Sequence, residues 1–230
     1  MTEHDGAVLT GTALHKSFGA TPALRGVDVA IAPGEQVAVT GPSGSGKSTL
    51  LHCLAGVTSP DSGFVSLAGH RLDSLSEHQR TRVRRVRIGL VLQFGQLVPD
   101  LTAVENVALP LLLEGRRRPD AEQAARGWLE RLGVGDRADV RPLELSGGEQ
   151  QRVAIARGLV TSPDVVLADE PTGALDTVTG EQALQVLVEA TRETGAALVV
   201  VTHDHRVAAH MERGIALRDG RVELVREPGA

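Results

Sequence analysis

Residues 41–49 carry the pattern G-x-x-x-x-G-K-[ST], which is typical of loops that bind polyphosphate. The alternating segment 36–40 predicts a strand before the loop, and apolar residues at helical spacing predict a helix after it that ends at Gly56. Such a turn presents backbone N–H groups and the positive end of a helix dipole to an anion. We therefore predict that a nucleotide is bound by Gly41, Ser43, Gly44, Ser45, Gly46, Lys47, Ser48 and Thr49.

Two side chains of this loop have chemistry of their own. Lys47 is placed to neutralise the β- and γ-phosphates, and the hydroxyl of Ser48 is placed to ligate Mg²⁺. We expect the glycines to let phosphate oxygens approach the backbone, which a side chain would prevent. A chance glycine-rich turn is the alternative, and the flanking strand and helix argue against it.

Two adjacent carboxylates, Asp169 and Glu170, follow the apolar segment 165–168, which predicts a buried strand. Ligands of open parallel sheets bind at the carboxyl ends of the strands. Asp169 is therefore predicted to hold the Mg²⁺ shell, and Glu170 to polarise an attacking water. An ordinary pair of surface carboxylates is the alternative, which the upstream phosphate loop disfavours.

The stretch 145–150 reads L-S-G-G-E-Q. Ser146 and Glu149 fit a capping box that opens a helix running to about residue 159. The capping box does not explain Gly147 and Gly148, because glycine destabilises a helix. Glycines there would leave N–H groups open to an anion. Since the chain has one nucleotide loop, we expect this helix end to face a nucleotide that another chain holds.

His203 follows the predicted strand 197–201. If that strand neighbours the one that leads to Glu170, both side chains meet at one edge of the sheet. His203 could then contact the γ-phosphate or orient the attacking water. A plain surface histidine is the alternative.

Composition narrows the function class. The 230-residue chain has a net charge of -5 and 2% aromatic residues, which argues against nucleic-acid binding. Its one cysteine, Cys53, excludes a disulfide framework and favours a reducing compartment. We expect Cys53 to be a small buried side chain. No apolar run is long enough to span a bilayer and no secretory signal opens the chain, so we expect a cytoplasmic protein.

The remaining elements alternate along the chain. Strands are expected over much of 7–40 and at 64–67 and 88–92, with Phe18 in a loop between the early strands. A polar helix is expected from about 74 to 86, with its dense arginines on a solvated face. Further predicted elements are helices at 104–113, 121–132 and 177–194, and a hairpin around Asp219 and Gly220.

These motifs, in this order, resemble those of the nucleotide-binding subunits of ATP-binding-cassette (ABC) transporters. The similarity covers essentially the whole chain from Phe18 to the final hairpin, and the stretch 145–150 matches the signature that separates this family from other phosphate-loop proteins. Within the family, segments 101–107 and 171–176 are similar to those of the macrolide-exporter and lipoprotein-release group.

The resemblance implies an α/β fold, namely a P-loop NTPase core with a mixed sheet, a β-rich N-terminal part and an inserted α-helical subdomain. Residues 1–230 would form a single ABC ATPase domain. The core, with its N-terminal antiparallel part, would comprise 1–93 and 161–230, and the helical subdomain with the signature would comprise 94–160.

The resemblance also assigns roles to particular residues. Phe18 takes the adenine-stacking position, and Gln93 is the glutamine that reports the nucleotide state where core and helical insert meet. The implied catalytic set is Glu170, His203, Gln93 and Lys47, and the implied Mg²⁺ ligands are Ser48, Gln93 and Asp169. The nucleotide of one chain would be closed by the partner copy through Ser146, Gly147, Gly148 and Glu149.

The implied function is Mg²⁺-dependent ATP hydrolysis that drives a separate transmembrane permease with an extracytoplasmic domain, in the direction of export. Two copies would dimerise head to tail when ATP binds, on the inner face of the cell membrane, to which only the permease attaches them. One alternative is a mechanical signalling ATPase similar to the cell-division members of this group. A soluble phosphate-loop kinase or GTPase is disfavoured, because it would leave the signature unexplained.

Overall fold

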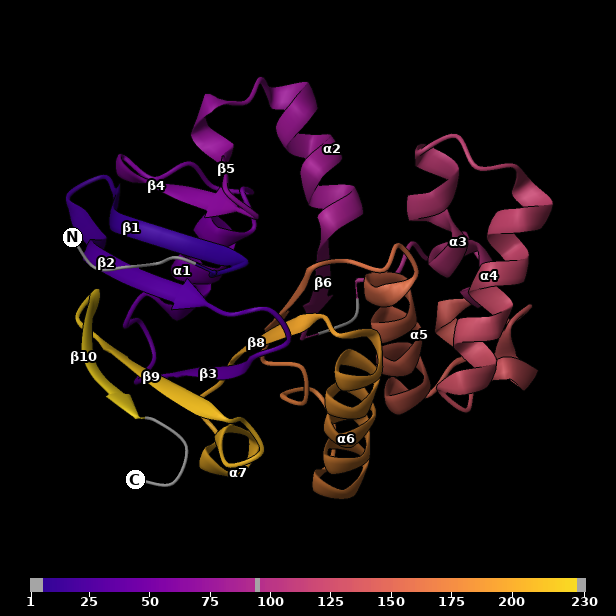
Figure 1. Ribbon diagram of the computed structural model, residues 1–230. Coiled ribbons are helices and arrows are strands. Elements are labelled where there is room, and N and C mark those ends of the chain that lie inside the picture. The colour runs from indigo at the N-terminus through magenta and orange to yellow at the C-terminus, as the bar shows by residue number, and fades with distance from the viewer. Residues whose placement is uncertain (1–5, 94–95, 227–230) are drawn as a thin grey trace.

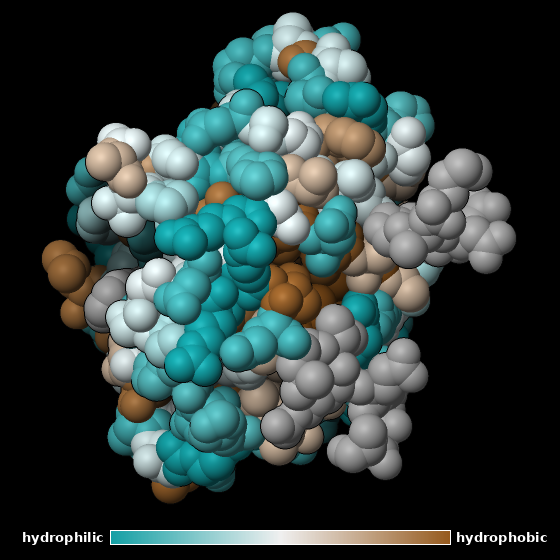
Figure 2. All heavy atoms as spheres, turned by 90° about the vertical axis from the view of Figure 1, so that its left-hand side faces the viewer, coloured by the Kyte–Doolittle hydropathy of each residue, from teal (hydrophilic) through white to brown (hydrophobic). Residues whose placement is uncertain are grey.

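The computed structural model describes residues 6–93 and 96–226, which form two sheets and a set of helices between and beside them (Figure 1). The smaller sheet is antiparallel and has the strand order β2-β1-β4-β5. Its strands are β1 (Leu9–Phe18), β2 (Thr21–Ile31), β4 (Ser62–Leu67) and β5 (His70–Arg71). Hydrophilic residues cover most of this side of the molecule (Figure 2).

The larger sheet is mixed and has the order β10-β9-β3-β8-β7-β6. Its strands are β3 (Gln36–Thr40), β6 (Ile88–Leu92), β7 (Val165–Asp169), β8 (Ala197–Val201), β9 (Arg213–Arg218) and β10 (Arg221–Arg226). All neighbours are parallel except the β9–β10 hairpin, which turns at Asp219 and Gly220, both at positive φ, as the sequence predicted. The strand ends of β3, β7 and β8 therefore lie along one edge.

The helices follow the predicted spacing closely. They are α1 (Lys47–Leu54), α2 (Glu77–Arg87), α3 (Ala103–Leu113), α4 (Arg118–Arg131), α5 (Gly147–Leu159), α6 (Thr177–Thr194) and α7 (His205–Ala208), with 3-10 turns η1 (Leu72–Ser74), η2 (Gly135–Arg137) and η3 (Pro142–Glu144). Within the described ranges, every helix is too short or too polar to cross a bilayer. The mixed sheet and the helices between β6 and β7 agree with the expected α/β fold class.

Two apolar cores lie on opposite faces of the larger sheet. Along β8, Val199 and Val201 pack with α1 and the smaller sheet, whereas Leu198 and Val200 pack with α3 to α6. Strands buried on both faces read as continuous apolar runs, which is why 197–201 has no polar position. Cys53 lies in the first core, as predicted, and burial raises the pKa of its thiol to about 11.

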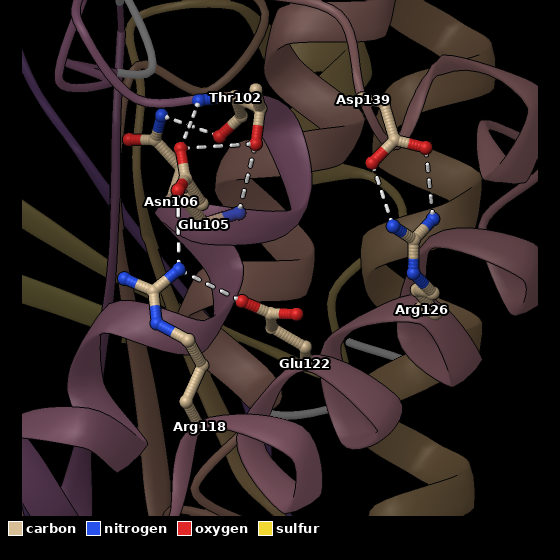
Figure 3. A network of polar contacts seen from close by, with 7 residues as sticks. All are labelled: Thr102, Glu105, Asn106, Arg118, Glu122, Arg126 and Asp139. Atoms are coloured by element: carbon tan, nitrogen blue, oxygen red, sulfur yellow. Dashed lines mark hydrogen bonds and ion pairs between the residues drawn. The ribbon is translucent and has the colours of Figure 1, made fainter.

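Between β6 and β7 the chain contains α3, α4 and α5, which lie together at the far side from the smaller sheet (Figure 1). Buried Asn106 on α3 fixes the preceding loop, since its amide accepts from the Val98 N–H and donates to three carbonyls. Arg118 on α4 pairs with Glu105 on α3 (Figure 3). Phe94, the predicted first residue of this insert, lies outside the described residues.

The arginines of α2, predicted to lie on a solvated face, are partly exposed but also contact neighbouring segments. Arg82 and Arg85 both pair with Glu114 at the end of α3, and Arg87 pairs with Asp164 before β7. Arg84 donates to the Gly56 carbonyl. Arg82 is exposed although it is paired, and the other four arginines of this helix are half-buried. The ion pairs and hydrogen bonds of these arginines connect α2 to neighbouring segments.

Candidate nucleotide-binding site

The phosphate loop joins β3 to α1, as the alternation and helical spacing predicted. Gly46 precedes the helix with φ +102°, a conformation that only glycine adopts without strain. No side chain caps the N-terminus of α1, and its first turn contains no acidic residue. The first N–H groups of α1 are therefore free of side-chain acceptors, which leaves them for an anion.

The glycines of this loop have a structural reason that differs from the predicted one. A Cβ at Gly41 would lie 2.0 Å from the Leu217 carbonyl oxygen, and a Cβ at Gly46 would lie 2.3 Å from the Ala23 carbonyl oxygen. Gly44 faces open space, although its φ of +76° favours glycine. Contact with these backbone carbonyls therefore accounts for glycine at positions 41 and 46. That the glycines also let phosphate oxygens approach the backbone stays a prediction.

Lys47 is folded back onto its own loop. Its Nζ donates to the carbonyl oxygens of Gly41 at 2.8 Å and Pro42 at 2.9 Å, and the residue is 8% exposed. The Lys47 side chain therefore links the start of the loop to the start of α1. An ammonium has three donors, so one remains for a phosphate oxygen.

Ser48 and Asp169 meet at the end of β7, where the sequence predicted a metal site. The Ser48 hydroxyl donates to Asp169 Oδ1 at 3.2 Å. Burial raises the pKa of the Asp169 carboxyl, and the Ser48 hydrogen bond opposes that rise. Mg²⁺ prefers oxygen ligands and is commonly held by one or two carboxylates together with substrate phosphates. The pair fits this cation.

Glu170 and His203 are in direct contact, because β7 and β8 are neighbours with Asp169 opposite Val201. His203 Nδ1 lies 2.6 Å from Glu170 Oε1, which also accepts from the His203 N–H at 3.2 Å. The Thr202 hydroxyl donates to Glu170 Oε2 at 3.3 Å. Glu170 has φ +45°, a strained backbone of the kind that persists at functional sites and costs about 1–3 kcal/mol.

One cavity of about 290 Å³ brings Lys47, Ser48, Glu170 and His203 together, whereas Asp169 lies behind Ser48 and does not line it. Its lining consists of Ala23, Ser43, Gly44, Gly46, Lys47, Ser48, Thr49, Glu170 and His203. Gly41 and Ser45 belong to the loop but do not line the cavity, and Ser45 is buried. Sequence reasoning missed two contributors. Ala23 offers no chemical signal, whereas Thr202 could have been noticed as the hydroxyl directly before His203.

Gln93 and Phe18, both predicted site residues, lie outside this lining. The Gln93 side chain lies beside Gly173, where an added Cβ would come within 2.8 Å of Nε2. Phe18 is the last residue of β1, so the expectation of a loop position is wrong by one residue. It is 57% exposed, which agrees with its exclusion from the core.

The signature residues also lie outside the cavity of their own chain. Ser146 and Glu149 form the predicted capping box, with Glu149 Oε2 accepting from the Ser146 N–H at 2.8 Å. Backbone and hydroxyl hydrogen bonds from Ser146 lower the pKa of Glu149. A Cβ at Gly148 would lie 2.4 Å from Thr179 Cγ2 on α6. Close packing of α5 on α6 therefore supplies a reason for Gly148 that requires no anion.

Comparison with known proteins identifies the family. The family model described as ABC transporter matches residues 24–173. A lipoprotein-releasing system ATP-binding protein of Caulobacter vibrioides is 50% identical over 90% of this chain and 91% of its own. A protein of the same description from Legionella pneumophila is 46% identical over 93% of this chain and 96% of its own. These relatives support transport over the cell-division-type alternative.

Two solved structures share the fold at high identity. A dimeric bacterial ABC transporter cassette has a TM-score of 0.89 and 40% identity, over 96% of this chain and 99% of its own. A dimeric cassette in a post-hydrolysis state with ADP and phosphate has a TM-score of 0.88 and 39% identity at the same coverage. The chain belongs to the ABC transporter family, in which it is an ATP-binding and ATP-hydrolysing subunit.

Proposed function

We propose that this chain is the motor subunit of a lipoprotein-releasing exporter, in which ATP-driven pairing of two copies moves a separate transmembrane permease. The observation that carries the proposal is the cavity in which Lys47, Ser48, Glu170 and His203 converge. The names of its relatives supply the substrate class. The permease would have an extracytoplasmic domain and would hold the chain on the inner, cytoplasmic face of the membrane.

Within the cavity, the residues around the phosphate loop would bind ATP. The uncapped start of α1 would face the phosphates, and the Lys47 ammonium, already fixed by two carbonyls, would add a positive charge beside them. Ser48 and Asp169 would hold Mg²⁺, whose charge neutralises that of the phosphates when it is bound. Phe18, exposed at the end of β1, would stack on the adenine.

Glu170 would act on the attacking water as general base. His203 and Thr202 hold its carboxylate from both sides, so its oxygens have a fixed direction at the mouth of the cavity. His203, whose side chain is 72% exposed, would exchange this contact for one with the γ-phosphate. Gln93, beside Gly173, would join the metal and water only after a movement that brings its amide to the cavity.

The second copy would complete the site. Ser146, Gly147 and Glu149 lie outside their own chain's cavity, at the start of α5, where they would face the nucleotide of the other copy. Gly148 would contribute its N–H to the same surface. The division into a core of 1–93 and 161–230 and a helical part of 94–160 gives each chain both faces that a head-to-tail pair requires.

Reconstitution tests this function directly. The chain and its permease are placed in vesicles with a lipid-modified protein and with the same protein lacking its lipid. We expect ATP to drive release of the lipid-modified form only, and the chain to sediment with membranes only when the permease is present. Membrane retention without a permease, or ATP hydrolysis that never releases the lipid-modified protein, would contradict the proposal.

A further inference from the structure

Besides their pairing with β2, the last residues of β1 are held by one residue from another part of the chain. Asp61, in the segment that leads from α1 to β4, accepts from Lys16 Nζ at 2.8 Å and from the Ser17 N–H at 2.6 Å. Its own N–H donates to the His15 carbonyl at 2.8 Å. Three consecutive residues of β1 are therefore bound by Asp61 at the point where the strand approaches Phe18.

The strand needs this support because its regular pairing ends there. The pairing of β1 with β4 stops at His15, opposite Ser62. On the other side, the register of β1 with β2 shifts between Leu14 and His15 and again between Lys16 and Ser17. A strand end with irregular pairing is weakly specified by the sheet itself. At this strand end, the Asp61 carboxylate accepts the hydrogen bonds from the Ser17 N–H and the Lys16 ammonium.

The same carboxylate places a cation against the aromatic ring. Lys16 Nζ lies 5.7 Å from the centre of the Phe18 ring, within the range of a cation–π interaction. The Lys16 side chain is 17% exposed, so its position is constrained. Phe18 itself is 57% exposed, which leaves ring surface for another planar group.

The hairpin that carries Phe18 is also attached to the phosphate cavity. Ala23 on β2 lines that cavity, and its carbonyl lies against Gly46. The Arg25 N–H donates to the Gly220 carbonyl, and the Gly220 N–H donates to the Ser45 carbonyl. The backbone thus fixes the hairpin relative to the phosphate loop, while Asp61 fixes the strand end that presents the ring.

We propose that Asp61 and Lys16 form a positioning pair that orients Phe18 for the purine base of the nucleotide. The pair touches neither base nor phosphate and acts through the ring. This inference rests on the proposed function, specifically on Phe18 as the platform for the base. It predicts that loss of Asp61 weakens recognition of the base and leaves the grip on the phosphates unchanged.

A double-mutant cycle tests the pair, with ADP as the nucleotide and inorganic pyrophosphate as the probe without a base. Asp61→Ala removes all acceptors, and Asp61→Asn keeps the acceptor for Ser17 but loses the ion pair. We expect Asp61→Ala to weaken ADP binding about 3- to 10-fold, as loss of hydrogen bonds of ordinary strength would, with Asp61→Asn intermediate. Pyrophosphate binding should stay within about twofold of the parent, and Asp61→Ala should have no further effect in Phe18→Ala.

The chain contains a matched control in the same sheet. Asp73 pairs with Arg71 at 2.6 Å, and Arg71 lies 4.1 Å from the centre of the Phe64 ring. This trio repeats the chemistry of Asp61, Lys16 and Phe18, but Phe64 lies on β4 and not in the β1–β2 hairpin, whose Ala23 lines the phosphate cavity. Asp73→Ala should therefore leave ADP affinity unchanged.

Four results would overturn the inference. Asp61→Ala could leave ADP affinity intact while Phe18→Ala lowers it, or it could weaken pyrophosphate as much as ADP. It could also weaken ADP equally with and without Phe18, which would place its action elsewhere. If Phe18→Ala itself changes nothing, the base platform of the proposed function fails first and the positioning role falls with it. A melting curve of each variant shows that the fold is kept.

Discussion

Glycine stands at the start of both α1 and α5, since Gly46 directly precedes α1 and Gly147 is the first residue of α5. The first turns of the two helices are nevertheless satisfied in opposite ways. The start of α1 has no side-chain cap and no acidic residue, and a lysine stands at its first position. The start of α5 has a complete capping box, in which Ser146 Oγ accepts from the Glu149 N–H and the Glu149 carboxylate accepts from the Ser146 N–H. The N–H groups at the start of α1 therefore lack side-chain acceptors, whereas those at the start of α5 have acceptors from the helix itself.

The two helix starts therefore differ in how much they gain from a bound anion. An uncapped N-terminus with a cation beside it gains most from a bound phosphate. A helix start that already holds a carboxylate gains less, so α5 is suited to close over a nucleotide that another site has bound first. Gly148 of α5 likewise has a reason within its own chain, because a side chain at this position would collide with Thr179.

The largest expected effect comes from removing the cation at α1. Lys47→Ala should lower ATP turnover by about 10²–10³-fold or more, because a fixed donor beside the developing charge is lost. Lys47→Met keeps most of the buried side-chain volume and should lose as much, which separates charge from packing. Steady-state hydrolysis by the purified variants measures the effect. Turnover of Lys47→Met near that of the parent would show that the ammonium is not the essential group.

A smaller effect should distinguish the two glycines of α5. Gly148→Ala places a methyl group against Thr179 Cγ2 and should lower the free energy of unfolding by about 1–2 kcal/mol. Gly147→Ala meets only the flexible end of Leu175 at 3.1 Å, so a change below about 0.5 kcal/mol is expected after the gain in helix propensity. Urea titrations measure both. Adding Thr179→Ser removes the methyl group that collides and should restore Gly148→Ala; no restoration would leave the steric explanation unsupported.

The smallest effect concerns the pH dependence of the cap on α5. The pKa of Glu149 is lowered in the folded chain, first by the Ser146 N–H. Its contribution is therefore fully present above the unfolded value of about 4.3 and is lost as pH falls through the folded value. Glu149→Gln should be less stable than the parent by about 0.3–1 kcal/mol at pH 7. The two stabilities should converge in urea titrations only when the pH has fallen below the lowered pKa of Glu149. A difference in stability that stays constant with pH would contradict a role for the charge of Glu149.

Local pattern predicted the elements of the fold well. The alternation at 36–40, the helical spacing at 177–194 and the Asp219-Gly220 turn all report on neighbours in sequence, and each was found. The partners of the α2 arginines could not be predicted in this way. Glu114 is reached from Arg82 and Arg85 only after α2 and α3 have been placed by the core.

The candidate site shows the same limit. Motif and strand order were sufficient to predict that Glu170 and His203 meet, because both follow neighbouring parallel strands. The sequence could not show why a side chain is excluded at Gly41, because the group that would collide with it is the carbonyl of Leu217, which is distant in sequence. The position of Gln93 beside Gly173 depends on a turn that carries no periodic signal.

In the proposed head-to-tail pair, the open site at α1 of one copy is closed by the capped start of α5 from the other copy. Glu170→Gln keeps the shape and most hydrogen bonding of the side chain but removes the base. ATP should then bind and persist. Gel filtration with light scattering should show Glu170→Gln as a dimer with ATP, and the parent mostly as a monomer.

Two variants in the Glu170→Gln background decide which surface closes. Ser146→Arg places a bulky cation at the start of α5 and should return the protein to a monomer. Gln123→Arg makes the same kind of change at an exposed position on α4 and should leave the dimer intact. We expect an ATP-dependent dimer that Ser146→Arg abolishes and Gln123→Arg does not. A Glu170→Gln chain that binds ATP and stays monomeric, or a dimer that survives Ser146→Arg, would contradict it.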